Sequence, residues 1–299
     1  MRGSSILTGL LVSAAFGVGT SMPASAKTLN AVASFTVLAD VVKQVGGEHV
    51  IVTSLVGPNG DPHDFEPSPD DAKKLKEADV TFISGEGLES WFERLVKASG
   101  YSGKPVVASE GVKTRTMDEA GKTIIDPHVW NSPVNIEVWV ENIEKALAAA
   151  DPEDAAVFKA NAARYTKVLK ELEAYAKSRF EIVPQDRRKI LTSHNAFGYF
   201  GREYGITLLS PVGLSTETEA SAADVGKLID QIKKENVKTY FFENSNDSRL
   251  VLQISKATGA EPGGELYVEA LSKEDGPAPT YAKMFRYNVD LISKAIAGS

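Results

Sequence analysis

The 299-residue sequence contains no cysteine. This absence argues against disulfide bonds, thiolate metal ligands and a lipid-modified cysteine. Histidine is also scarce, with four residues in the whole chain. After residue 26, no stretch approaches the roughly 18 consecutive apolar residues of a membrane-spanning helix. Any site built from imidazoles must therefore use most of the histidines that the chain has.

Basic residues are not in excess. The chain has 33 Lys and Arg against 40 Asp and Glu, a formal net charge of −7. A nucleic-acid-binding protein carries clustered positive charge on one face, so this balance argues against such a partner. A chain of this length can bury a large core, as one large or two medium-sized domains.

The first 26 residues have the pattern of a cleavable signal peptide. Arg2 supplies the positive charge, Ile6 to Val18 form a short apolar core, and Ala24-Ser25-Ala26 is a cleavage signal. The mature chain is predicted to run from Lys27 to Ser299. Because it has no cysteine to carry a lipid, we expect an exported periplasmic protein with no lipid anchor.

Short apolar runs alternate with helical patterns along the chain, which predicts an α/β fold with parallel sheets flanked by helices. The predicted strands of the first lobe are Leu29–Phe35, Val50–Val56, Val80–Ser84 and Val106–Ser109. The helical patterns between them are Val37–Val45, Pro69–Ala78 and Leu88–Lys97. The predicted strands of the second lobe are Lys189–Ser193, Ile206–Val212, Val237–Glu243 and Glu265–Val268.

One long helix is predicted between the two sets of strands. Asp151-Pro152-Glu153-Asp154 indicates a helix start, and no glycine or proline follows until Pro184. Apolar residues recur every three or four positions from Phe158 to Ala176, as on one face of a helix. We therefore expect a signal peptide at 1–26, an N-terminal lobe at 27–150, a stiff linking helix at 151–183 and a C-terminal lobe at 184–299.

Three of the four histidines follow predicted strands. His63 lies beside Pro62 after a Gly-Pro-Asn-Gly turn, His128 lies in Asp126-Pro127-His128, and His194 follows Lys189–Ser193. Parallel α/β sheets bind ligands beyond the carboxyl ends of their strands, so all three should face one cleft between the lobes. His49 precedes a strand and is expected at the surface.

Three imidazoles and one carboxylate suit a borderline cation such as Zn²⁺. Two carboxylates are candidates for the fourth position, because Glu269 and Glu243 each end a predicted strand of the second lobe. Water is a further alternative. A zinc-dependent hydrolase would use the same histidines with an open position, but the sequence has no H-E-x-x-H pattern. A receptor for iron-siderophore or vitamin B12 would share the two-lobe plan without needing the histidines.

Four segments resemble the signatures of the cluster A-I metal-binding proteins of ABC transporters, the ZnuA- and TroA-like zinc and manganese receptors. The segments are PHDFEPSPDD, DPHVWNSP, TSHNAFGYF and LYVEALSKEDGPAPTYAKMFRYN. The resemblance covers nearly the whole mature chain and implies two α/β lobes with a metal between them. It also implies delivery of that metal to a membrane permease powered by a cytoplasmic ATPase, with no reaction catalysed by this chain.

Carried over position by position, the resemblance implies His63, His128, His194 and Glu269 as metal ligands. The last position is usually Asp in the family, and the third is Glu in many manganese-binding members. Asp126 and Glu243 are candidates for orienting the imidazoles by hydrogen bonding. The segment from Gly111 to Asp126 lacks the histidine-rich loop of many zinc receptors.

The missing histidine-rich loop argues against Zn²⁺, whereas His194, in place of the Glu of many manganese-binding members, favours it. The ligand His194 decides for Zn²⁺ as the transported ion, ahead of Mn²⁺ and Fe²⁺. A periplasmic metallochaperone is a conceivable further partner, and a monomer is expected. Because a neutral imidazole is the ligand, the affinity should fall as the pH drops through ~6.5.

Overall fold

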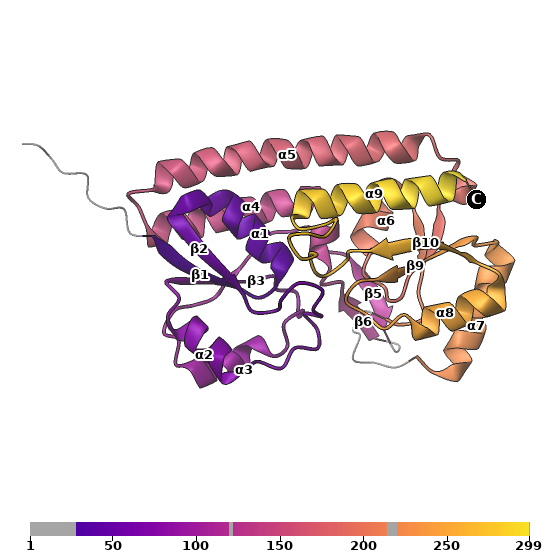
Figure 1. The fold of residues 1–299 in the computed structure, drawn as a ribbon, viewed down its shortest axis with the longest axis horizontal. Coiled ribbons are helices and arrows are strands. Elements are labelled where there is room, and N and C mark those ends of the chain that lie inside the picture. Colours follow the sequence, from indigo (N-terminus) through magenta and orange to yellow (C-terminus); the bar gives the residue numbers. More distant parts are fainter. Residues whose placement is uncertain (1–27, 120–121, 214–219, 299) are drawn as a thin grey trace, which may run out of the picture.

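The computed structural model describes residues 28–119, 122–213 and 220–298. The predicted signal peptide at 1–26 lies outside these residues. The described chain forms two four-stranded parallel sheets, one from each half of the sequence, and an antiparallel two-stranded hairpin. Helices flank both sheets, and the two halves lie side by side along the long axis of the molecule (Figure 1). The predicted α/β class with two parallel sheets is therefore confirmed.

The N-terminal sheet has the strand order β2-β1-β3-β4. Its strands are β1 (Leu29–Ala33), β2 (Val50–Ser54), β3 (Val80–Ile83) and β4 (Val106–Val107). The helices and turns among them are α1 (Thr36–Gly46), η1 (Gly47–His49), α2 (Pro69–Lys76) and α3 (Phe92–Ser99). Helix α2 begins as predicted: Ser68 and Asp71 form a capping box, and Pro69 occupies the first turn.

The C-terminal sheet has the strand order β10-β9-β7-β8. Its strands are β7 (Lys189–Leu191), β8 (Thr207–Leu209), β9 (Thr239–Glu243) and β10 (Glu261–Leu266). The helices and turns of this half are η3 (Gln185–Arg187), α6 (Gly198–Tyr204), α7 (Ala222–Glu235), α8 (Arg249–Thr258) and α9 (Tyr281–Ala297). The loops after β7, β9 and β10 reach the boundary between the halves.

A layer of long helices covers one side of both sheets. It consists of α4 (Pro133–Ala150), α5 (Ala155–Glu181) and α9 (Figure 1). Helix α5 packs against α1 and α4 of the first half and against α9 and α6 of the second. The predicted apolar stripe is buried, including Phe158, Leu169 and Ala176. A single helix that contacts both halves fits the predicted stiff connection.

The predicted start of the long helix is wrong by four residues. Helix α5 begins at Ala155, and Asp154 makes no capping hydrogen bond. The Asp154 carboxylate instead lies 2.5 Å from Nδ1 of His49. This contact accounts for His49, which is half-buried at the end of η1 rather than a bare surface residue.

Two further elements differ from the sequence-based expectation. A hairpin of β5 (Thr116–Glu119) and β6 (Lys122–Ile125) occupies a segment in which no strand is predicted from the sequence. Strand β10 begins at Glu261, four residues earlier than predicted, and includes Pro262 and two glycines. The strand lies at the edge of the sheet and has a register shift after Pro262. Proline and glycine are tolerated in strands at such edges and irregularities.

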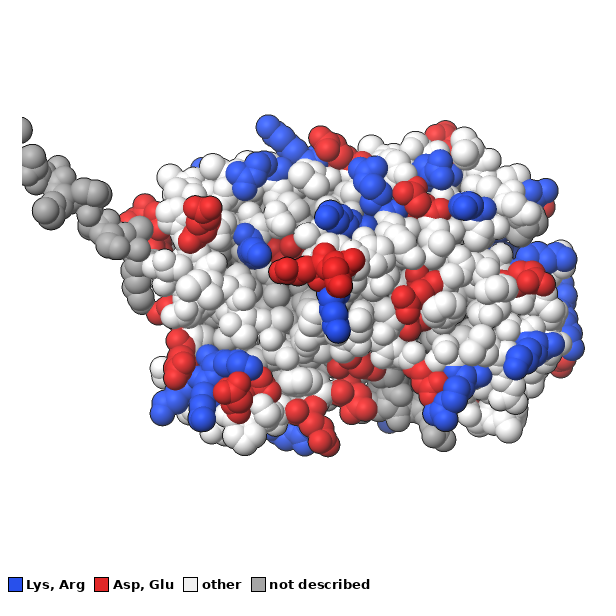
Figure 2. Space-filling model, in the orientation of Figure 1, with Lys and Arg blue, Asp and Glu red and all other residues white. Residues whose placement is uncertain are grey.

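Charged side chains of both signs are interspersed over the face shown in Figure 2. This mixture matches the moderate net charge of −7. Among the helices within the described ranges, none combines the length and the apolar character needed to cross a membrane.

Candidate metal centre

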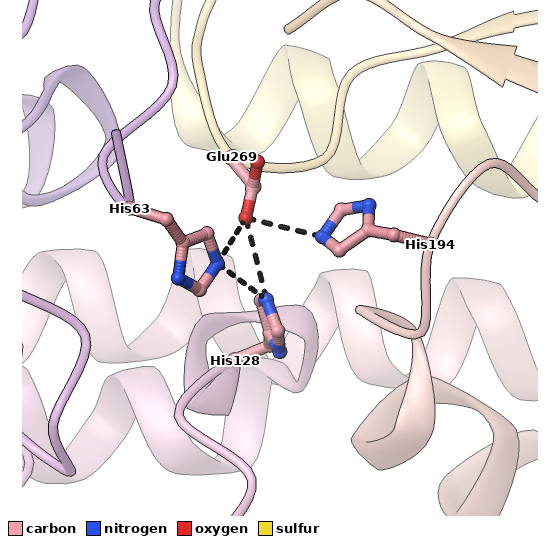
Figure 3. Close-up of side chains that lie close together, drawn as sticks. All are labelled: His63, His128, His194 and Glu269. Carbon is pink, nitrogen blue, oxygen red and sulfur yellow. Dashed lines mark hydrogen bonds and ion pairs between the residues drawn. The ribbon is translucent and has the colours of Figure 1, made fainter. Parts of the chain in front are cut away.

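Four side chains from distant parts of the sequence converge at the boundary between the two halves. His63, His128, His194 and Glu269 each point one atom toward a common centre, and these four atoms all lie within 4.8 Å of one another (Figure 3). All four residues are buried, with His63 the most exposed at 6%. Two ligand candidates come from each half.

The contacts are close to the edges of a tetrahedral coordination site. Oε1 of Glu269 lies 2.7 Å from Nε2 of His63, 3.2 Å from Nε2 of His194 and 3.3 Å from Nε2 of His128. The Nε2 atoms of His63 and His128 are 3.1 Å apart. Four donors bound at the usual zinc distances would be separated by about 3.3 Å, close to these four contacts. The remaining separations, which reach up to 4.8 Å, must shorten when the atoms enclose an ion.

His63 is held by the stiff loop that the sequence predicts. The loop joins β2 to α2, and Pro62 precedes the histidine. The indole of Trp91 donates a hydrogen bond of 2.8 Å to the Pro62 carbonyl, and the His63 N–H donates one of 2.8 Å to Asp61. The loop is therefore held at Pro62 by the Trp91 side chain and at His63 by the Asp61 side chain.

His128 is oriented by Asp126, as expected from the sequence. Oδ1 of Asp126 accepts hydrogen bonds from the His128 N–H at 3.0 Å and from its Nδ1 at 2.9 Å. Since Nδ1 carries the donated proton, the lone pair of Nε2 is left toward the centre. The other oxygen of Asp126 pairs with Arg115, which the sequence analysis did not single out.

Tyr199 of α6 supports this pair from the C-terminal half. Its hydroxyl donates a hydrogen bond of 2.8 Å to the Asp126 carbonyl and accepts one of 3.2 Å from the Arg115 N–H. A Trp130 hydrogen bond of 2.6 Å to the Val268 carbonyl also crosses between the halves, next to Glu269. The imidazole of His128 is thus positioned by residues of both halves.

His194 follows β7 and has the equivalent support from Glu243, the last residue of β9. Oε2 of Glu243 accepts the Nδ1 proton, and Oε1 accepts the N–H groups of Ser193 at 3.0 Å and His194 at 3.2 Å. Glu243 therefore lies behind the imidazole. Glu269, in the loop after β10, is the carboxylate that faces the centre.

The charges of the cluster are mutually stabilising. Burial alone would lower the pKa of His194, but Glu243 and Glu269 outweigh it and raise this pKa well above its usual range. The pKa of His128 is raised in the same way, by Asp126 and Glu269 against its burial. Burial would raise the pKa of Glu269, yet the histidines hold it well below its usual range. The cluster therefore contains a carboxylate beside two imidazoles, those of His128 and His194, that hold protons tightly.

A second set of polar residues was missed by the sequence analysis. Asn244, Ser245 and Asn246 follow Glu243 directly and contact the loops of the C-terminal half that carry His194 and Glu269. Their place at the carboxyl end of β9 was a usable signal, because polar residues there face the ligand edge of a parallel sheet. His49 lies outside the cluster, as predicted.

Comparison with known proteins gives a family match over most of the chain. The family described as zinc-uptake complex component A, periplasmic (ZnuA), matches residues 31–295. The iron-binding protein YfeA of Yersinia pestis is 33% identical, and the match covers 90% of this chain and 87% of the relative. The manganese-binding lipoprotein MntA of Bacillus subtilis is 34% identical, with 90% of each chain covered.

Solved structures show the same fold. The periplasmic zinc-binding protein TroA of Treponema pallidum superposes with a TM-score of 0.85 at 29% identity, covering 90% of this chain and 99% of TroA. A manganese-bound periplasmic metal-binding protein of Candidatus Liberibacter asiaticus superposes with a TM-score of 0.81 at 29% identity, with the same coverage. The relatives are thus named for three different metals.

The expectation of a protein with no lipid anchor is contradicted by these relatives. MntA, and the FimA and PsaA proteins of two streptococci, are named lipoproteins. The expectation was wrong because it rested on the missing cysteine alone, and an absent residue type does not define where a protein resides.

The family match covers most of the chain, and the relatives include named substrate-binding proteins of metal ABC transporters. Proteins of this kind are the solute-binding components of transporters. This chain belongs to the ZnuA family and is a metal-binding substrate-binding protein of an ABC transporter.

Proposed function

We propose that this protein captures Zn²⁺ and delivers it to the permease of an ABC transporter, whose ATPase subunit supplies the energy. The ligands are Nε2 of His63, His128 and His194 and one oxygen of Glu269. The two ligand pairs come from segments 27–150 and 184–299, which we propose act as two lobes joined through 151–183.

One observation carries the choice of zinc: three imidazole nitrogens and a single carboxylate oxygen converge within 4.8 Å. Imidazole suits Zn²⁺, whereas carboxylate, carbonyl and water oxygens suit Mn²⁺. Four donors with contacts of 2.7–3.3 Å around Glu269 also match the small tetrahedral site that zinc prefers.

Manganese is the second candidate, supported by relatives whose names state it. MntA is 34% identical and the PsaA protein of Streptococcus pneumoniae is 32% identical to this chain. Their names place Mn²⁺ within the range of the family. Because relatives of similar identity are named for iron as well, the donor set of this chain is the better guide.

The buried fourth donor favours transport over hydrolysis. A catalytic zinc keeps one position open for water, with three protein ligands. Here Glu269 is fully buried among the three imidazoles and fills that position. A closed site binds a cargo ion without activating water.

Calorimetric titration of Zn²⁺ and Mn²⁺ into the metal-stripped protein tests the proposal. We expect one zinc per chain, bound more tightly than manganese. His194→Ala should weaken zinc binding by more than the ~10–100-fold typical of residues that only orient a ligand. His49→Ala is the matched control, because His49 pairs with Asp154 outside the cluster, and it should bind zinc like the unmodified protein.

Two results would overturn the proposal. Tighter binding of manganese than of zinc would make this protein a manganese receptor. An equal loss of zinc affinity in the His49 and His194 variants would show that the cluster is not the binding site.

A further inference from the structure

The two oxygens of the Glu269 carboxylate have different surroundings. Oε1 faces all three imidazoles, at 2.7 to 3.3 Å. Oε2 instead accepts a hydrogen bond of 3.2 Å from the hydroxyl of Ser245. Figure 3 shows the contacts of the cluster meeting at one oxygen of Glu269, with the other turned away.

The position of Ser245 relative to Glu269 is fixed by its neighbour Asn244. The Asn244 N–H donates a hydrogen bond of 3.0 Å to the Leu266 carbonyl. Its side chain accepts one of 3.3 Å from the Val268 N–H and donates one of 3.2 Å to the Ala270 carbonyl. The backbone is therefore tied on both sides of Glu269, and the hydroxyl of Ser245 stays beside Oε2.

This arrangement restricts how the carboxylate can bind a cation. Coordination through both oxygens would bring Oε2 to about 2.2 Å from the ion, which requires it to leave Ser245. Zinc is satisfied by four ligands and needs one oxygen from Glu269. Manganese favours octahedral, oxygen-rich coordination and would gain from the second oxygen. A long glutamate side chain can swing both oxygens inward unless something holds one of them back.

We propose that Ser245 is a specificity-determining residue, whose hydroxyl holds Glu269 to one coordinating oxygen and so favours four-coordinate Zn²⁺ over Mn²⁺. The inference rests on the proposed function, because it assumes that Glu269 is a metal ligand. It adds a residue that contacts a ligand without facing the ion.

The test compares three variants with the unmodified protein. Ser245→Ala removes the hydroxyl, and Ser245→Thr keeps one at the same place. Ser248→Ala is the matched control, since Ser248 lies in the same loop and its side chain makes no capping hydrogen bond. Dissociation constants for Zn²⁺ and Mn²⁺ are measured by competition with a chromophoric chelator. Circular dichroism of each metal-free variant checks that it is folded.

We expect Ser245→Ala to reduce the ratio of zinc affinity to manganese affinity by about tenfold, the lower end for residues that support a metal ligand. Ser245→Thr and Ser248→Ala should keep the ratio of the unmodified protein. The visible spectrum of bound Co²⁺ gives a second readout, because tetrahedral Co²⁺ absorbs strongly and higher coordination weakens the bands. These bands should weaken in Ser245→Ala.

The outcomes separate the two proposals. If the unmodified protein binds zinc more tightly than manganese and Ser245→Ala changes neither the ratio nor the Co²⁺ spectrum, the role of Ser245 is refuted and the zinc function stands. If the unmodified protein prefers manganese, the zinc function fails, and with it the inference that Ser245 selects for zinc. Binding of neither metal overturns both.

Discussion

The side-chain oxygen of Asn59 accepts a hydrogen bond of 2.9 Å from the amide of Asn244. Asn59 belongs to the turn that precedes His63, and Asn244 begins the loop after β9, which contacts the loop that carries Glu269. The Asn59 N–H also donates a hydrogen bond of 3.2 Å to the Leu271 carbonyl, two residues after Glu269. This turn thus connects the loop of a ligand candidate in the first half to the loop of one in the second.

Asn59→Gly should accelerate release of the metal. Asn59 has a φ of 59°, in the left-handed region, which glycine adopts without strain. The substitution therefore removes the side-chain hydrogen bond and leaves the turn intact. Loss of one hydrogen bond between the halves, worth about 1 kcal/mol, should raise the release rate about fivefold. Stopped-flow transfer of zinc to an excess of chelator measures this rate.

Asn236→Gly is the matched control for that experiment. Asn236 has a φ of 54° and ends α7, so the same substitution is made in the same backbone conformation away from the cluster. It should leave the release rate unchanged. Equal release rates for both glycine variants and the unmodified protein would mean that the Asn59 contact does not restrain the metal.

Gly198→Ala should weaken metal binding through Asp126. A Cβ on Gly198 would lie 1.7 Å from Nη1 of Arg115 and 2.5 Å from Oδ2 of Asp126. Relief of this overlap must move the carboxylate that holds Nδ1 of His128. We expect the zinc affinity, measured by calorimetry, to fall by roughly 10–100-fold, as for other residues that orient a metal-binding histidine.

A second glycine distinguishes this effect from a general effect of alanine. Gly226 lies within α7, and a Cβ there would meet no atom within 4 Å. Gly226→Ala should raise the free energy of unfolding by about 0.5–1 kcal/mol, because alanine favours the helix, and leave zinc affinity unchanged. An unaltered zinc affinity in the Gly198 variant would show that zinc binding does not depend on the present position of the Asp126 carboxylate.

The convergence of the histidines could be predicted because it follows from topology. His63 and His194 follow β2 and β7, and His128 comes after β4 and the β5–β6 hairpin. The carboxyl ends of the parallel strands meet at one edge of each sheet. The place of Ser245 after β9 indicates the ligand edge of the sheet, but its partner could not be assigned, nor could that of Asn59, since a serine or asparagine in a loop has no spacing that identifies its partner. Their roles depend on which loops the fold brings together.

The errors in the fold have specific causes. Asp154 has the pattern of a helix start, but its carboxylate pairs with His49, a contact made across about 100 residues. Strand β10 contains Pro262, Gly263 and Gly264, which argue against a strand by local propensity. The sheet edge accepts them there, because only one side of the strand must be paired.

As the pH is lowered, metal binding should begin to weaken at a higher pH than the ordinary pKa of a histidine side chain, ~6.5, implies. Metal coordination needs the Nε2 lone pair, so a proton on His194 or His128 competes with the ion. The pKa of His194 is raised well above its usual range, because Glu243 and Glu269 outweigh its burial. Zinc affinity should therefore fall with decreasing pH from above ~6.5. Calorimetric titration across pH 5–9 measures this fall.

The stability of the metal-free protein should change in the opposite direction. A histidine whose pKa is raised by folding stabilises the folded state fully below its unfolded pKa of ~6.5, and this contribution is lost as the pH rises through the folded pKa. The melting temperature without metal should therefore increase as the pH is lowered toward 6.5. Over the same interval, the increase produced by zinc should shrink. Thermal melts with and without zinc check both trends.

Glu243→Gln identifies the origin of this pH dependence. It removes one of the two carboxylates that raise the pKa of His194 while keeping a side-chain oxygen beside Nδ1. The midpoint of the loss of zinc affinity should therefore shift to lower pH. Asp247→Asn removes a charge from the same loop, where Asp247 is exposed and pairs with Arg249, and should leave the midpoint in place. Equal midpoints in both variants would show that the proton competing with zinc is not held through Glu243.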